Sequence, residues 1–115
     1  MPTKKPTPTI TERRIKAYVL RLYIEYESKY GKPKMPLKHV YVGKLPEPDD
    51  LGLTTQLLGK SHISITDEFV GTKHVDLLSE VVRHELAHVW CGVEYGHNKK
   101  WRRWAEKFGC KEVFY

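Results

Sequence analysis

The sequence predicts a single α+β domain, on the evidence of its length, its apolar periodicity and the positions of its prolines and glycines. The chain has 115 residues, which leaves room for one compact core but not for a second sizeable domain. Apolar residues recur at helical spacing near the start and again in the C-terminal part, and short strand-like stretches lie between them. This order predicts a helix, a small sheet and two further helices.

The first element expected is a long amphipathic helix. Residues 1–8 contain three prolines and two lysines and are expected to form a flexible basic tail, so the domain covers residues 9–115. Thr9 and Glu12 have the spacing of a capping box, and the apolar repeat that follows ends at a glycine and a proline. A helix is therefore predicted over residues 10–30.

Three short stretches in the middle of the chain favour strands. They cover residues 38–42, 53–58 and 61–66 and are separated by prolines and glycines. Gly59 and Lys60 are typical of a tight turn, so the second and third stretches are expected to form a hairpin. We expect the three to form a small antiparallel sheet.

Two more helices are predicted in the C-terminal part. Thr72 or Asp76 is expected to cap the first, which has a broad apolar face and ends near Cys91, where Gly92 follows. The second is expected to run over residues 98–108, with a glycine as its C-terminal stop.

The first of these helices contains the sequence His84-Glu85-Leu86-Ala87-His88, a match to the H-E-x-x-H pattern. Residues four apart lie on one face of a helix, so His84 and His88 can bind one Zn²⁺. Glu85 is offset by about 100° around the helix. Its carboxylate is therefore expected to reach the metal-bound water and act as general base.

A catalytic zinc site needs a third protein ligand, and three residues after the motif are candidates. Cys91 lies too far along the helix for its short side chain. His97 is better placed, because Gly92 and Gly96 bracket a turn that can bring it back toward the motif. Glu94 stays open as the alternative.

The segments HELAH and GHNKKW, followed by a tryptophan-rich helix that ends in FG, resemble the SprT-like metalloproteases over residues 75–109. The strand-like segments and the first helix are compatible with this resemblance. It implies a zincin-like minimal metalloprotease domain, with an N-terminal helix, a small antiparallel sheet, the HExxH helix and a C-terminal helix. Carried over by position, it implies zinc ligation by His84, His88 and His97 and catalysis by Glu85.

Two features depart from the family pattern. Asn98 stands where the family usually has glycine after the third ligand, and asparagine can cap a helix or adopt a left-handed backbone. Cys91 and Cys110 are the only cysteines, too few for the zinc ribbon of longer members. DNA contacts are therefore expected on another surface.

The basic character of the chain favours a polyanionic partner. Its formal net charge is +6, with 20 Lys and Arg against 14 Asp and Glu. One face of the last predicted helix is rich in cations, of which we assign four to nucleic-acid binding: Lys99, Lys100, Arg103 and Lys107. Such a run usually forms a solvated surface, but Lys99 and Lys100 fall where the helix dipole disfavours cations, a conflict that a bound phosphate relieves.

The function expected is that of a zinc-dependent endopeptidase. The resemblance implies that it digests proteins held on DNA, including covalent DNA–protein crosslinks, and that it has a role in DNA repair. The DNA is expected to be bound independently of sequence, as single strands or junctions. Two alternatives remain open: a zinc peptidase that cleaves a regulatory protein without DNA, and a non-catalytic basic DNA-binding module with structural zinc. We expect a monomer that makes no membrane contact and is cytoplasmic, or nuclear in a eukaryote.

Overall fold

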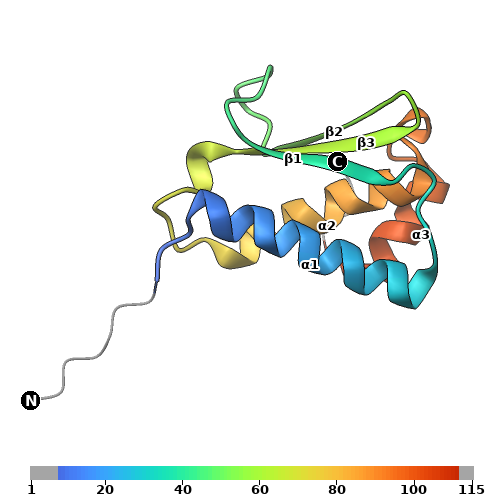
Figure 1. Cartoon of the computed structure of the whole chain (residues 1–115), viewed down its shortest axis with the longest axis horizontal. Helices are drawn as coiled ribbons and strands as arrows, with labels where there is room; N and C mark the ends of the chain where they lie inside the picture. The colour runs from blue at the N-terminus through green and yellow to red at the C-terminus, as the bar shows by residue number, and fades with distance from the viewer. Residues whose placement is uncertain (1–7, 112–115) are drawn as a thin grey trace, which may run out of the picture.

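The computed structural model describes residues 8–111 and confirms the α+β class (Figure 1). Most of the predicted basic tail lies outside the described residues. Within them, no helix is long and apolar enough to cross a bilayer. The elements, in chain order, are α1 (Glu12–Tyr30), β1 (Leu37–Gly43), β2 (Gly52–Leu57), β3 (Lys60–Thr66), the 3-10 turn η1 (Asp67–Phe69), α2 (Val75–Cys91), the 3-10 turn η2 (Val93–Tyr95) and α3 (Lys99–Lys107).

The sheet is mixed, so the prediction of a wholly antiparallel sheet was wrong. The strand order is β1-β3-β2, with β2 antiparallel to β3 but β1 parallel to it. Alternate side chains of β3, those of Ser61, Ile63 and Ile65, are fully buried, whereas β1 and β2 are more exposed. The most deeply buried strand, β3, is therefore the central one. β1 pairs with the edge of β3 that β2 does not occupy.

The β2–β3 hairpin was predicted correctly, but its turn lies one residue earlier than expected. Leu58 and Gly59 occupy the turn with φ values of 53° and 76°. Positive φ at both central residues is the requirement of a type I′ turn, whose twist matches that of a hairpin. A glycine tolerates this conformation, whereas a leucine does so only at a cost.

The helices cover one face of the sheet, as Figure 1 shows. α1 packs against β1, α2 packs against β2 and β3, and α3 packs against α2. The core lies between these layers. Its largest completely buried aliphatic side chains come from α1, β3 and α2: Ile15, Val19, Ile63, Ile65, Val82, Leu86 and Val89.

α1 begins two residues later than predicted, and its cap is Thr11 rather than Thr9. The Thr11 hydroxyl accepts a hydrogen bond from the Arg14 backbone N–H at 3.1 Å. Ile10 is not helical, because its backbone pairs with the segment before α2: its N–H donates to the Thr72 carbonyl at 2.8 Å. This pairing and the burial of the Ile10 side chain hold the start of the domain extended.

The cap predicted for α2 was wrong, and for α3 the structure decides between two roles that the sequence left open. α2 is preceded by His74, which makes no side-chain capping bond, so neither Thr72 nor Asp76 is its cap. Asn98 caps α3 and does not adopt a left-handed backbone: its side-chain oxygen accepts from the Lys100 and Trp101 backbone N–H groups at 3.0 and 3.3 Å.

Candidate metal centre and active site

Three histidine side chains converge at one point beside α2. The His97 Nε2 atom lies 3.1 Å from the Nε2 atoms of both His84 and His88. Three nitrogens placed tetrahedrally at about 2.0 to 2.1 Å from one Zn²⁺ would lie about 3.3 Å apart. The structure therefore brings the three expected ligands together as a group able to hold a metal ion.

The local sequence explains how the third histidine arrives. Gly92 ends α2 with φ 107°, and Gly96 follows η2 with φ 54°. Both values lie in the region that favours glycine. The chain therefore reverses between α2 and α3, and His97 meets His84 and His88 from outside the helix, as predicted.

The three imidazoles are in the form that binds a metal. Burial, with a smaller contribution from the neighbouring histidines, lowers the pKa of His84 to about 3 and that of His88 to about 4. Burial also lowers the pKa of His97. Neutral imidazole offers a lone pair, and three such nitrogens are a usual donor set for catalytic zinc.

Glu85 lies beside this group without belonging to it. Its side chain is buried, and its Oε2 atom lies 3.9 Å from His84 Nε2. The Thr54 hydroxyl on β2 donates a hydrogen bond to Glu85 Oε1 at 2.8 Å. Burial raises the pKa of Glu85 to about 7, although the Thr54 hydrogen bond opposes the rise and the charge of Asp50 adds to it.

The alternative ligand Glu94 and the excluded candidate Cys91 both lie elsewhere. Glu94 is exposed and forms an ion pair with Lys34. Cys91 is buried, and burial raises the pKa of its thiol. Neither residue belongs to the three-histidine group.

Trp101 of α3 packs against all three histidine rings of the site. Its ring centroid lies 4.6, 5.3 and 4.7 Å from those of His84, His88 and His97. Its indole N–H donates to the His84 carbonyl at 3.4 Å, and the side chain is fully buried. The contact of this tryptophan with all three histidines was not predicted from the sequence.

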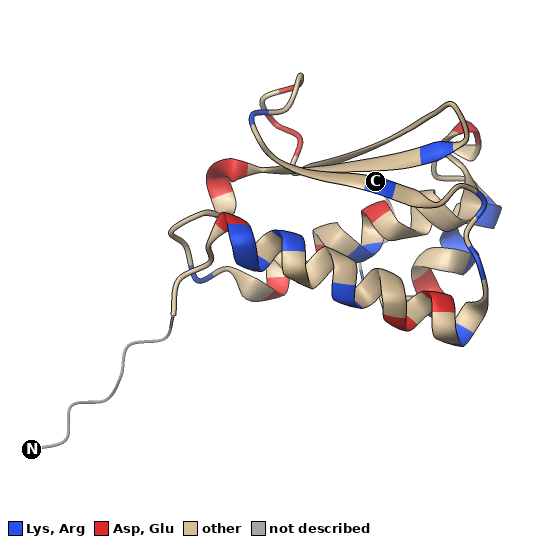
Figure 2. Ribbon diagram, in the orientation of Figure 1, with Lys and Arg blue, Asp and Glu red and all other residues tan. Residues whose placement is uncertain are grey.

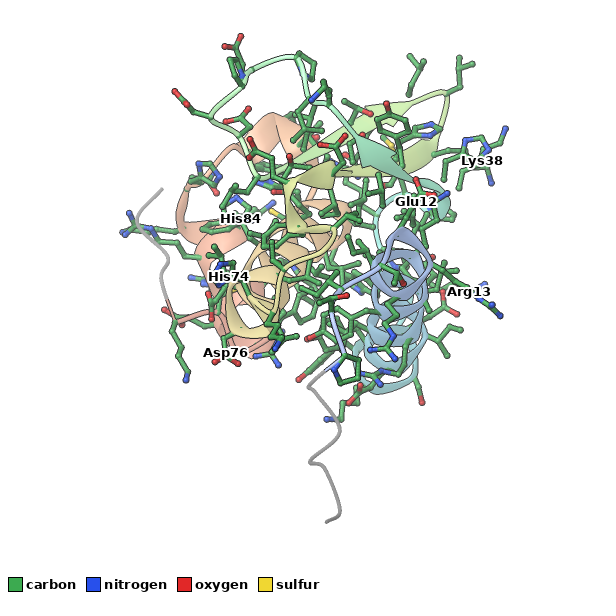
Figure 3. All side chains as sticks on the ribbon, turned by 90° about the vertical axis from the view of Figure 1, so that its left-hand side faces the viewer. Glu12, Arg13, Lys38, His74, Asp76 and His84 are labelled. Atoms are coloured by element: carbon green, nitrogen blue, oxygen red, sulfur yellow. The ribbon has the colours of Figure 1, made fainter. Side chains whose placement is uncertain are left out.

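The site opens into a cleft of about 830 Å³, a volume within the range of ligand pockets. The first half of β2, the loop before it and one face of α2 line this cleft. Besides Glu85, four of the lining residues are acidic: Asp49, Asp50, Asp76 and Glu80. Figure 3 shows His84 and Asp76 on one side of the molecule, opposite Arg13 and Lys38.

The four cations assigned to nucleic acid are exposed on α3, and Figure 2 shows basic residues on this helix. Lys100 lies over the Tyr95 ring at 4.3 Å, and Lys107 lies over the Trp104 ring at 4.5 Å. The first turn of α3 contains no acidic residue. Lys99 and Lys100 therefore stand at the positive end of the helix, as the sequence indicated.

The remaining histidines do not join the metal group. His39 and His62 are cross-strand neighbours on β1 and β3, with ring centroids 5.4 Å apart. His74 precedes α2. Tyr95, close to the site in sequence, is not among the residues that line the cleft.

Sequence reasoning missed the two β2 residues that touch Glu85, Gly52 and Thr54. Thr54 is buried on an edge strand, and a β-carbon added to Gly52 would lie 2.9 Å from Glu85 Cγ. The only sequence signal for these two residues was their separation by two positions, which places both on the same face of a strand.

The comparisons with known proteins agree with the geometry. The model of the SprT-like family matches residues 22–114, which is most of the chain. No curated protein and no solved structure matches it. The family match covers α2, the turn and α3, and so includes every residue of the three-histidine group. The chain belongs to the SprT-like family.

Proposed function

We propose that this protein is a zinc-dependent endopeptidase that acts on DNA-associated proteins, including proteins crosslinked to DNA. The observation that carries the proposal is the convergence of three imidazole nitrogens beside a buried carboxylate at a cleft. Zinc held by His84, His88 and His97 would supply a polarising cation and an activated water.

Glu85 is the general base of the proposed reaction. It lies next to the histidine group but is not one of its members, so its carboxylate is available for proton transfer. Its raised pKa, about 7, suits a group that takes a proton from the attacking water and returns it to the leaving amine near neutral pH. The adjoining cleft has room for an extended segment of polypeptide.

The charge of the cleft supports a basic protein substrate. Carboxylates contributed by the loop before β2 and by α2 line the cleft, and they attract positively charged segments. Proteins that bind DNA are rich in such segments. The same carboxylates repel DNA, so the nucleic acid must bind elsewhere.

The exposed basic face of α3 is the proposed DNA surface. Lys99, Lys100, Arg103 and Lys107 would contact phosphates, which makes binding independent of sequence and weaker at high salt. DNA held on this face would bring its bound proteins to the protease.

The deciding experiment measures hydrolysis of an unfolded lysine-rich protein, with and without single-stranded DNA. The wild type should hydrolyse it and contain one zinc per chain, whereas Glu85→Gln should keep the zinc and lose at least about 10²-fold in rate. Zinc-loaded wild type without hydrolysis, or a Glu85→Gln variant with full activity, would contradict the endopeptidase.

A charge-reversal pair tests the DNA surface separately. Lys99→Glu with Lys100→Glu should weaken DNA binding and reduce the log–log salt slope by about 0.7 to 0.9 for each phosphate that the variant no longer neutralises. The matched control is Lys44→Glu with Lys73→Glu, which changes the net charge equally at exposed positions outside α3. If both pairs bind DNA as the wild type does, α3 is not the DNA surface, and DNA-independent hydrolysis favours a peptidase without a DNA role.

A further inference from the structure

We propose that Gly52 and Thr54 of β2 are positioning residues, which hold the Glu85 side chain so that one carboxylate oxygen faces the three-histidine group. The inference rests on the proposed function, because it assigns a purpose to the contacts of the proposed general base. Neither residue is a metal ligand.

Thr54 holds one of the two carboxylate oxygens. Its hydroxyl lies 2.8 Å from Glu85 Oε1 and 3.1 Å from the Glu85 backbone carbonyl. A hydroxyl has one proton to donate, and a charged acceptor at the shorter distance makes the stronger bond. Both residues are buried, so little water competes for this bond.

The other carboxylate oxygen remains directed at the site. Glu85 Oε2 lies 3.9 Å from His84 Nε2, and Glu85 lines the cleft. The two oxygens are therefore distinct: Oε1 is tied to the sheet, and Oε2 is presented toward the place where a water would react. Because the Glu85 carboxylate is already held in place, no free energy is lost in orienting it during the reaction.

Gly52 leaves the space on β2 into which the Glu85 side chain packs. A β-carbon added at this position would lie 2.9 Å from Glu85 Cγ, 3.0 Å from Oε2 and 2.8 Å from Val81 Cγ1. Its φ is not positive, so the position needs a glycine for space and not for backbone conformation. The strand backbone itself is thus one wall of the Glu85 pocket.

The two contacts come from one face of one strand. Residues two apart in a strand point to the same side, and this side of β2 packs against α2. Thr55, next to Thr54 on the same strand, points the other way and is exposed. The chain therefore contains a matched control on β2.

The test compares Thr54→Val, Thr54→Ser and the control Thr55→Val as zinc-loaded enzymes. Valine keeps the shape of threonine and removes the hydroxyl, whereas serine keeps the hydroxyl and removes a methyl group. Thr54→Val should lower kcat about 10- to 100-fold with little change in KM or zinc content. Thr54→Ser should restore most of kcat, and Thr55→Val should match the wild type.

If the role of Thr54 were purely structural, Thr54→Val would keep more activity than Thr54→Ser. Serine would then be the worse substitution because it leaves a cavity, and activity would follow the fraction of folded protein. Gly52→Ala should also lower kcat because its methyl group would displace Glu85, but the threonine series decides the matter if this variant fails to fold. Equal kcat values for Thr54→Val and Thr54→Ser overturn the inference.

A second measurement separates this inference from the proposed function. In crystal structures of the zinc-free proteins, the Glu85 carboxylate should keep its position in wild type and Thr54→Ser and leave it in Thr54→Val. If the wild type hydrolyses no substrate, the proposed endopeptidase function is contradicted. The crystal structures still test whether Thr54 holds the Glu85 carboxylate in position. An unmoved carboxylate in Thr54→Val overturns the inference whether or not the protein is an enzyme.

Discussion

Glu85→Gln should change how the stability of the metal-free protein depends on pH. The Glu85 side chain is buried, since the residue is 5% exposed, and burial raises its pKa from 4.5 to about 7. The folded state therefore binds this proton more tightly than the unfolded state does. The stability associated with the proton is fully present below pH 4.5 and is lost as the pH rises through about 7.

The size of the effect follows from the two pKa values. At about 1.4 kcal/mol for each pH unit by which the pKa is displaced, the move from 4.5 to about 7 corresponds to about 3 kcal/mol. Roughly 2.5 kcal/mol of this falls between pH 5 and pH 8. Glutamine has almost the same shape and does not titrate, so the variant should gain stability relative to wild type by that amount over this interval.

The assay is urea unfolding of zinc-stripped protein at several pH values, followed by tryptophan fluorescence. Both proteins contain the same histidines, so the difference between the two unfolding free energies reports on Glu85. Glu68→Gln, the same change at an exposed carboxylate, is the control. Parallel profiles for Glu85→Gln and wild type would refute the reasoning, because they would mean that the folded protein does not disfavour the charged carboxylate. Zinc should shrink the difference, since a nearby cation favours the carboxylate.

Three further predictions concern the fold. Leu58→Asn should stabilise the protein by about 1 kcal/mol, because Leu58 is 92% exposed and has a left-handed backbone; a lower melting temperature for this variant would contradict the assigned turn. Ile63→Ala, at a fully buried position of the central strand, should cost about 2 to 5 kcal/mol in urea unfolding, and a loss below about 1 kcal/mol would be inconsistent with that burial. Burial raises the pKa of the Cys91 thiol and raises that of Cys110 to about 12, so a thiol reagent should label both slowly in the folded protein and quickly in denaturant.

The sequence was sufficient to predict those structural features that depend only on residues close together in the chain. The four-residue spacing of His84 and His88 depends only on helix geometry, and Asn98 caps α3 through atoms within three residues of itself. The same holds for the reversal that brings in His97, because Gly92 and Gly96 each adopt a backbone that glycine favours. The expected metal group was therefore assembled from nearby parts of the chain.

The wrong predictions for the start of α1 and the direction of β1 both depend on distant partners. Thr9 and Thr11 are both able to cap a helix, and the choice between them follows from the pairing of Ile10 with Thr72. The direction of β1 is likewise decided by where β3 lies, which no local pattern records. Thr54 was missed for the same reason, since its role depends on the helix that packs against its strand.

The placement of Trp101 gives the site a built-in optical label. An indole in contact with three imidazoles should change its emission when their lone pairs engage a cation or when they become protonated. Replacing the other two tryptophans, Trp90 and Trp104, with phenylalanine would leave this single emitter. Metal uptake and release could then be timed in a stopped-flow instrument without a dye, a competing chelator or a substrate.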